Sequence, residues 1–256
     1  MARSRRRGAS RRHRHGRDCV RPGRRAHLPP SCRRRPWLRS PRRPGSRVSA
    51  VLAIDTASPA FALALDGGPG EEPRIVESIA DFSHASLLAA VDEELRGASL
   101  EAVVAVCGPG SYSGLRAGIA TAQGLALAQG CLLAGIPTLE AVVAACRGSR
   151  DPTAIHPAGR GEFAAQDIRD GAPHGPTRIA SPEDLAGLAL VGEGAGTLGG
   201  REVLPRERAA AALARYRSGA LEPVSELTAI YLREPNITAP RRPFGPAGAQ
   251  DRLPAR

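Results

Sequence analysis

Short apolar strands alternate with helical segments along residues 51–145, and this alternation constrains the fold more than any other feature of the chain. Three strands joined by glycine- and proline-containing turns predict an antiparallel meander. The run "EAVVAV" is apolar throughout, which is typical of a strand buried on both faces of a sheet. The order βββαβαβα therefore predicts an α/β lobe, with strands at 51–55, 61–66, 74–79, 101–106 and 131–135 and helices at 84–96, 114–129 and 138–146.

The pattern over residues 151–234 is less regular. It predicts strands at 152–156, 162–168 and 188–192, a helix that begins at Ser181 and another over 206–217. We expect a first lobe over residues 48–150, a second, smaller lobe of the same class over 151–234 and a loose C-terminal tail over 235–256.

The charge of the chain is concentrated in its first 47 residues. The 256 residues carry a formal net charge of +11, but residues 1–47 hold 18 of the 36 arginines and a single acidic residue, Asp18. The rest of the chain is therefore mildly acidic. With 42% apolar residues it can bury a core, which excludes disorder of the whole chain.

The arginine-rich extension over 1–47 also contains six prolines and few apolar residues, so we expect it to be disordered. Three explanations are open: an RNA-binding arm, an organelle transit peptide, or translated sequence upstream of the true start. The prolines disfavour the amphipathic helix of a transit peptide. A start near Val48 is the favoured explanation, and deletion of 1–47 is then expected to leave folding unchanged.

The cysteines and histidines indicate neither a disulfide framework nor a metal site. Five cysteines form no CxxC pair, which favours a reduced, cytoplasmic compartment. His84, His156 and His174 are too far apart in sequence to bind a metal from one helix. No apolar run reaches membrane-spanning length, and we expect no membrane partner. Spacing alone nominates no catalytic residue.

A glycine-rich loop, Gly108–Gly114, lies between a predicted buried strand and the longest helix, where backbone N–H groups and the helix dipole favour an anion. The loop fits neither a Walker motif nor a nucleophile elbow. Asp55 and Thr56 end the first strand and could hold a metal-bound phosphate, although a turn-capping aspartate is an equal alternative. The candidate phosphate-binding residues are Asp55, Thr56, Gly108, Gly110 and Ser111.

Two further glycine patterns have both a functional and a purely structural interpretation. Residues 194–199 fit GxGxxG, but no long helix opens directly from the loop, so the match is weak. Gly114, Gly118 and Ala122 recur at four-residue spacing and give the helix a small-residue face that a second helix can approach closely. We expect this face to contact a partner or to be buried in the lobe.

Several stretches together resemble the TsaB (YeaZ) family of bacterial tRNA threonylcarbamoyladenosine biosynthesis. They lie between residues 48 and about 234 and read "VLAIDTASPAFALAL", "SHASLLAAVDEEL", "VCGPGSYSGLRAGIATAQGLALAQG", "GIPTLEAVVAA" and "IYLRE". The third of these stretches is the most specific to the family. The resemblance implies an actin-like ATPase (ASKHA) fold with two related lobes. It also implies a non-catalytic scaffold that supports a TsaD-like transferase by forming a heterodimer.

The resemblance further implies how the complex is organised. The dimer surface would lie on the helices that begin at His84 and near Gly114, with His84, Leu88, Gly114, Gly118 and Ala122 as interface residues. A TsaE-like ATPase would join the complex, tRNA would bind through it, and a homodimer is an alternative. ATP and metal are expected on the partner subunits, since residues 138–143 lack the histidines of the sibling's HxxxH metal site.

Two other functions stay open at this stage. One is an actin-like small-molecule kinase that uses ATP through Asp55 and the two glycine loops, although residues 48–234 are short for such an enzyme. The other is a nucleic-acid binder that acts through the arginine-rich extension and binds with steep salt dependence.

Overall fold

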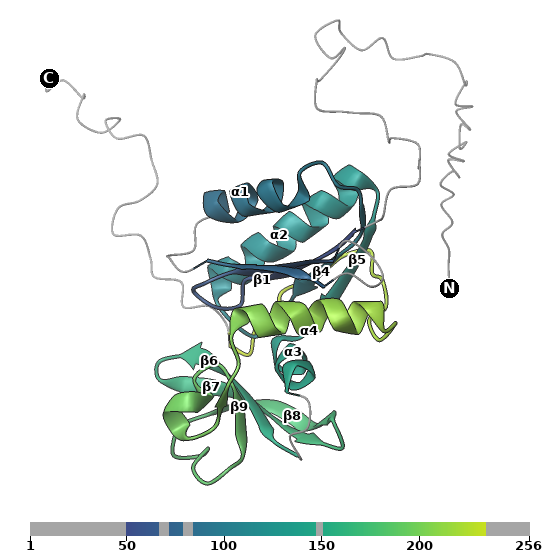
Figure 1. Ribbon diagram of the computed structural model, residues 1–256. Helices are drawn as coiled ribbons and strands as arrows, with labels where there is room; N and C mark the ends of the chain where they lie inside the picture. The colour runs from purple at the N-terminus through teal and green to yellow at the C-terminus, as the bar shows by residue number, and fades with distance from the viewer. Residues whose placement is uncertain (1–49, 67–71, 79–83, 147–150, 234–256) are drawn as a thin grey trace, which may run out of the picture. The chain divides into compact units, whose positions relative to one another are not determined.

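The computed structural model describes residues 50–66, 72–78, 84–146 and 151–233. Within these ranges the chain forms two five-stranded mixed sheets flanked by helices (Figure 1). The arginine-rich extension and the C-terminal tail lie outside the described residues.

The first sheet has the strand order β3-β2-β1-β4-β5. Its first three strands form the predicted antiparallel meander, and β4 and β5 continue the sheet in parallel with β1. The strands are β1 (Ala50–Asp55), β2 (Ala62–Asp66), β3 (Arg74–Glu77), β4 (Leu100–Val106) and β5 (Leu132–Ile136). The strands predicted from the sequence for this lobe are therefore confirmed.

The second sheet has the order β10-β9-β6-β7-β8. Here too a meander of three antiparallel strands comes first, and two parallel strands extend the sheet beside the first strand of that meander. The strands are β6 (Thr153–Gly159), β7 (Glu162–Arg169), β8 (Ala172–Ala180), β9 (Leu190–Gly192) and β10 (Arg201–Glu202). The two sheets thus share one strand order, which confirms the prediction of two related lobes.

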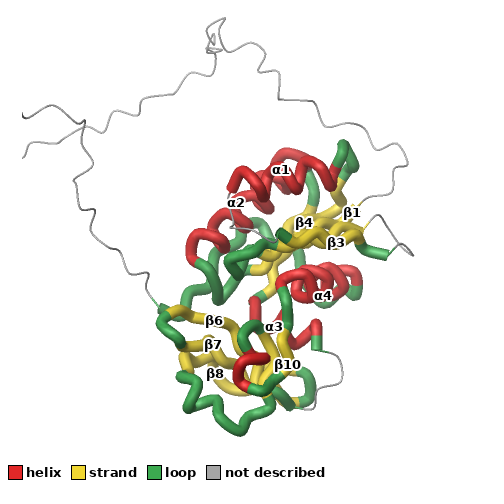
Figure 2. The backbone as a smooth tube through the Cα atoms, turned by 60° about the vertical axis from the view of Figure 1, so that its left-hand side comes forward, coloured by secondary structure: helices red, strands yellow, loops and turns green. Residues whose placement is uncertain are grey.

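The four α-helices of the described chain are α1 (His84–Leu95), α2 (Tyr112–Gln129), α3 (Thr138–Ala145) and α4 (Pro205–Arg217). α1 and α2 cover one face of the first sheet and α4 covers the opposite face (Figure 1). α3 packs against β6, β7 and β9 of the second sheet and also contacts α4 (Figure 2). None of these helices combines the length and apolarity that a bilayer span requires.

The alternation of side chains along β1 divides the first core in two. Leu52 and Ile54 pack with the helices α1 and α2, whereas Val51 and Ala53 face α4. The α4 side is rich in alanine on both the sheet and the helix, which allows the helix to approach the sheet closely.

Four features of the second half differ from the sequence predictions, and one of them is the two-residue strand β10, which was not predicted. The helix predicted to begin at Ser181 is wrong: residues 182–187 form successive turns, with a reciprocal cap between Ser181 and Asp184, and the chain leaves them at Gly187 with φ +78°. β8 was not predicted, because most of its side chains are exposed. α4 follows the second sheet in sequence but covers the first, so this helix lies outside the lobe predicted over 151–234.

Candidate functional site

Asp55 ends β1 between the two lobes, and both of its carboxylate oxygens have protein partners. Oδ1 accepts a hydrogen bond from the backbone N–H of Ala57 at 2.9 Å, which closes the turn after the strand. Oδ2 accepts from Nε of Arg208 at 2.7 Å. The side chains of Asp55 and Arg208 are both fully buried. Asp55 therefore caps a turn and pairs with an arginine, so its carboxylate does not face an open phosphate site.

Arg208 projects from α4 and joins groups from both lobes. Nη1 donates to Oε2 of Glu193 at 2.9 Å, just after β9, and to the backbone oxygen of Val203 at 3.3 Å. Nη2 donates to Oγ of Ser58 at 2.5 Å, and the Ser58 hydroxyl also donates to Glu193. We call Asp55, Ser58, Glu193, Arg208 and the neighbouring His156 the interlobe network.

The charges in this network compensate one another. Burial by itself would lower the pKa of Arg208, but the nearby carboxylates of Asp55 and Glu193 and their hydrogen bonds raise it above the ordinary value. A guanidinium held in this way satisfies two carboxylates at once, which is how a buried charge is tolerated in a protein interior. The network therefore links the end of β1, the end of β9 and α4.

His156 of β6 lies at the edge of the interlobe network and is also buried. Its Nε2 lies 3.2 Å from the backbone oxygen of Ala57, and its Nδ1 lies 3.7 Å from Oε2 of Glu193 without a hydrogen-bond partner among the described residues. Burial and the positive charge of Arg208 lower the pKa of His156 to about 3, against smaller opposing effects of Asp55 and Ala57. The imidazole is therefore neutral at physiological pH.

The structure brings the predicted glycine loop and the Asp55–Thr56 turn together, but the two segments are in contact with each other. The backbone N–H of Ser111 donates to the oxygen of Ala57 at 2.6 Å, and Ser111 Oγ caps α2 by accepting from the N–H of Gly114. A Cβ at Gly110 would lie 2.5 Å from the same Ala57 oxygen, and one at Gly108 2.5 Å from the Ile230 oxygen. These glycines therefore permit close backbone packing, and phosphate binding by them stays a prediction.

The small-residue face of α2 is buried inside the lobe, and its assignment to a partner interface is wrong. Gly114, Gly118 and Ala122 are all buried. A Cβ at Gly118 would overlap the side-chain oxygen of Thr56, and one at Gly114 would overlap the Thr56 backbone oxygen. The close approach that these residues permit is that of α2 to the end of β1.

Other residues of α1 and α2 are exposed. Leu88 of α1 is 55% exposed and Leu127 of α2 is 87% exposed. A Cβ at Gly124 would meet no atom within 4 Å. His84 is the first residue of α1, and its side chain is not described. We call Leu88, Gly124 and Leu127 the helical surface patch.

The second glycine loop, Gly194–Gly199, carries a short 3-10 helix over Ala195–Leu198. The backbone N–H groups of Gly194 and Gly196 point to the Glu202 carboxylate, with N to O distances of 2.8 and 2.9 Å. Backbone amides placed in this way are the groups that would hold a phosphate in a nucleotide site. Here a carboxylate from β10 takes that position.

Sequence reasoning missed the partners that define this site: Ser58, Glu193, Glu202 and Arg208. One signal was available for Arg208, because it falls on the alanine-rich buried face of its helix, three residues after Pro205 and four before Ala212. The other three stand in turns and short strands; Ser58 and Glu193 are 135 residues apart, and Glu202 bonds to backbone amides, which no side-chain pattern reveals. Among the described residues, no group of three or more His, Cys, Asp and Glu side chains is placed to hold a metal ion.

Residues 78–187 match the TsaD family model, described as tRNA N6-adenosine threonylcarbamoyltransferase. Among solved structures, the chain is similar to YeaZ from Pseudomonas aeruginosa, with 22% identity, a TM-score of 0.55 and coverage of 72% of this chain and all of the other. A second P. aeruginosa structure, of a protein with similarity to peptidase YeaZ, gives 23% identity and a TM-score of 0.58 at the same coverage.

Proteins of mycobacteria are also similar to this chain. One from Mycobacterium leprae is 32% identical over 215 residues, which is 77% of this chain and 59% of that protein. One from Mycobacterium tuberculosis is 38% identical over 103 residues, or 38% of this chain and 49% of the other. The chain thus spans about half to three-fifths of the length of these relatives. The YeaZ structures confirm the two-lobed α/β fold that the resemblance to the TsaB (YeaZ) family implies, and the TsaD model matches part of the same chain.

Proposed function

We propose that this chain, with its TsaB-like sequence and YeaZ-like fold, is a non-catalytic scaffold subunit of the machinery that adds threonylcarbamoyl to an adenosine beside the tRNA anticodon. The match of residues 78–187 to the TsaD family supports a role in tRNA modification. The proposed role is to bind and support a TsaD-like transferase.

One observation carries the scaffold role. The protein's own side chains occupy both positions at which the sequence suggested a nucleotide phosphate. Asp55, which an actin-like kinase would need for metal-bound phosphate, is paired with Arg208 in a fully buried ion pair. The amides of the second glycine loop bind Glu202. A phosphate at the first position would have to displace a fully buried ion pair, which costs several kcal/mol, and at the second it would compete with the exposed Glu202 carboxylate for the same amides.

We place the transferase-binding surface on the helical surface patch of α1 and α2. Burial of an exposed leucine against a partner stabilises a complex by about 1.5 to 3 kcal/mol when the side chain starts fully exposed, so Leu127 gains more than the half-buried Leu88. Gly124, with open space around it, allows a partner helix to approach the α2 backbone. Leu88 keeps its predicted interface role, whereas Gly124 and Leu127 replace Gly114, Gly118 and Ala122.

The remaining parts of the proposal concern the assembly. A TsaE-like ATPase would join the heterodimer, tRNA would bind through the complex, and ATP and metal would be held by the partner subunits. A homodimer through the same patch is the alternative arrangement when the transferase is absent.

A pull-down of a TsaD-like transferase with patch variants tests the interface. Leu127→Asp and Leu88→Asp place a carboxylate where an apolar contact is proposed, and each is expected to weaken binding at least tenfold with the melting temperature unchanged. Leu188→Asp is the matched control, because Leu188 is 43% exposed and belongs to the second lobe. Full binding by both patch variants, or an equal loss in the control, would contradict the proposed interface.

The scaffold role is tested separately by the activity of the pure chain. We expect tRNA modification to require the transferase and the pure chain to hydrolyse no ATP. Rapid ATP turnover by the pure chain that Asp55→Asn abolishes would instead support the kinase alternative.

A further inference from the structure

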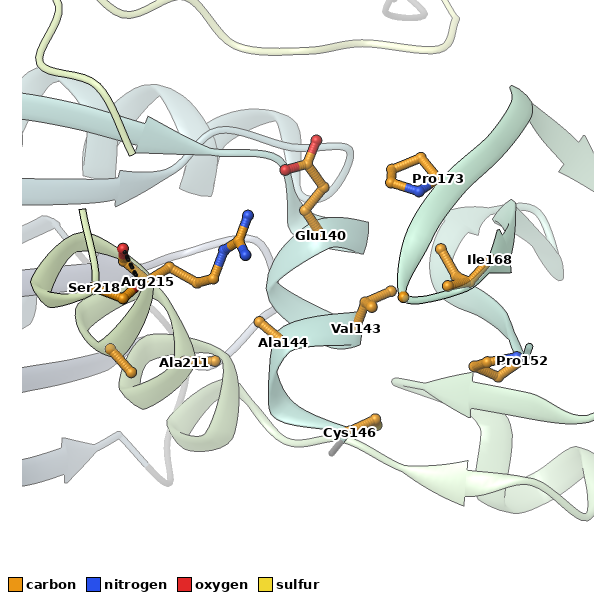
Figure 3. A pocket seen from close by; sticks show the side chains of 12 residues that line it. Glu140, Val143, Ala144, Cys146, Pro152, Ile168, Pro173, Ala211, Arg215 and Ser218 are labelled. Carbon is orange, nitrogen blue, oxygen red and sulfur yellow. Dashed lines mark hydrogen bonds between the residues drawn. The ribbon is translucent and has the colours of Figure 1, made fainter. Parts of the chain in front are cut away.

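A cavity of about 390 Å³ lies beside α3, apart from the interlobe network. Its walls come from α3, the C-terminal half of α4 and the β7–β8 hairpin (Figure 3). This volume falls near the lower end of the range for small-molecule sites, so the cavity has room for a compact ligand.

Most of the cavity wall is apolar. α3 contributes Val143 and Ala144, its C-terminal cap contributes Cys146, and the second sheet contributes Ile168 and Pro173. Burial has the largest effect on the pKa of the Cys146 thiol and raises it. The thiol is therefore protonated at neutral pH and does not act as a nucleophile there. The wall therefore favours an apolar group that is held without covalent chemistry.

Two side chains of opposite charge also line the cavity, Glu140 from α3 and Arg215 from α4 (Figure 3). The described part of the chain shows no ion pair or hydrogen bond for either side chain. This distinguishes Arg215 from its neighbours on the same helix, since Arg208 pairs with Asp55 and Arg217 with Asp66. The cavity thus offers one anionic and one cationic group above an apolar wall.

We propose that this cavity is a binding site for a free apolar α-amino acid. The guanidinium of Arg215 can bind the α-carboxylate through two parallel hydrogen bonds, and the carboxylate of Glu140 can accept from the α-ammonium. The apolar side chain then packs against Val143 and Ile168. A ligand with both charges on one carbon satisfies both protein groups, whereas either end of a peptide satisfies only one of them.

Thermal unfolding and calorimetry of the full chain with L-leucine test this assignment. A ligand that binds only the folded state raises the melting temperature in a saturable way. N-acetyl-leucine, which lacks the ammonium, and leucinamide, which lacks the carboxylate, are each expected to bind at least tenfold more weakly. Equal binding of N-acetyl-leucine would overturn the proposal in favour of a peptide C-terminus, and absence of leucine binding would overturn it altogether.

Charge variants locate the site. Glu140→Gln and Arg215→Gln are each expected to weaken leucine binding at least tenfold, while the matched exposed residues Glu226→Gln and Arg160→Gln leave it unchanged. Ala144→Phe, which fills the cavity from its partly exposed wall, is expected to abolish binding. Undiminished binding in all three cavity variants would place the ligand elsewhere and refute the site. If Ala144→Phe fails to fold, the two charge variants still show whether leucine binds in this cavity.

Discussion

The two lobes share one strand order but differ in how they are covered. In the first lobe every residue of β1 and β2 is buried, because α1 and α2 lie on one face of the sheet and α4 on the other. In the second lobe α3 covers one face, turns and the short 3-10 helix pack on the other, and the first five residues of β8 are exposed.

This difference predicts that the two lobes, although they share one topology, differ in stability. Strands buried on both faces gain more from apolar burial than half-exposed strands do. The second lobe receives additional stabilisation from α3 and from the interlobe network, in which Arg208 of α4 joins Asp55 to Glu193. We therefore expect the second sheet to open first, with amide hydrogen exchange faster in β7 and β8 than in β1 and β4.

The largest effect is expected from Arg208→Met, which removes the guanidinium that joins Asp55 to Glu193. It leaves the carboxylate of Asp55 buried without its partner and should lower the free energy of unfolding by about 3 to 5 kcal/mol. Adding Asp55→Asn should recover part of this loss. Urea denaturation measures both changes.

Arg206→Gln is the control for that experiment. Arg206 is an exposed residue of the same helix that pairs with Glu77, and loss of such a pair costs less than about 1 kcal/mol. A similar small loss in Arg208→Met would show that the lobes are not held together by the interlobe network.

A smaller effect is expected within the first lobe from two glycines of α2. Gly118→Leu overpacks the contact with Thr56 and should destabilise the fold by about 3 kcal/mol, the upper end for overpacked cores. Gly124→Ala is the matched change on the exposed face and should stabilise the helix by about 0.5 to 1 kcal/mol. Thermal unfolding measures both variants, and a fully stable Gly118→Leu would contradict the burial of that face.

The smallest expected effect is a pH dependence that comes from the second lobe. Because the pKa of His156 is lowered to about 3, the unfolded chain binds a proton below pH about 6.5 that the folded chain does not bind. Stability should therefore be unaffected by this group at neutral pH. It should fall as the pH drops below 6.5, by about 2 kcal/mol at pH 5.

Chemical denaturation of wild type and His156→Gln between pH 7.5 and 5 checks this dependence. The substitution should flatten it, whereas the exposed His174→Gln should not. An unchanged slope in His156→Gln would assign the pH dependence to other groups.

The first lobe was predictable because its signals are local. Continuous apolar runs such as "EAVVAV" and the helical periodicity around Leu87 and Val91 arise from burial of whole strands and helix faces, and the meander of this lobe follows from the turns between its strands. β8 and the turns at 182–187 gave no such signal, because most of their side chains are exposed; β8 is fixed by its pairing with β7, and the turns by hydrogen bonds between residues three apart.

From the sequence alone follow the α/β class, the order of the elements in the first lobe, and the residues that stand at the end of β1 and in the glycine loops. Only the tertiary structure decided what those residues do. Asp55 and Arg208 are 153 residues apart, and Glu202 reaches a loop whose fingerprint alone suggests a phosphate. The pairing of Asp55 with Arg208 depends on how α4 crosses back to the first sheet, because charge compensation in a buried site is set by distances in space, which no spacing along the chain specifies.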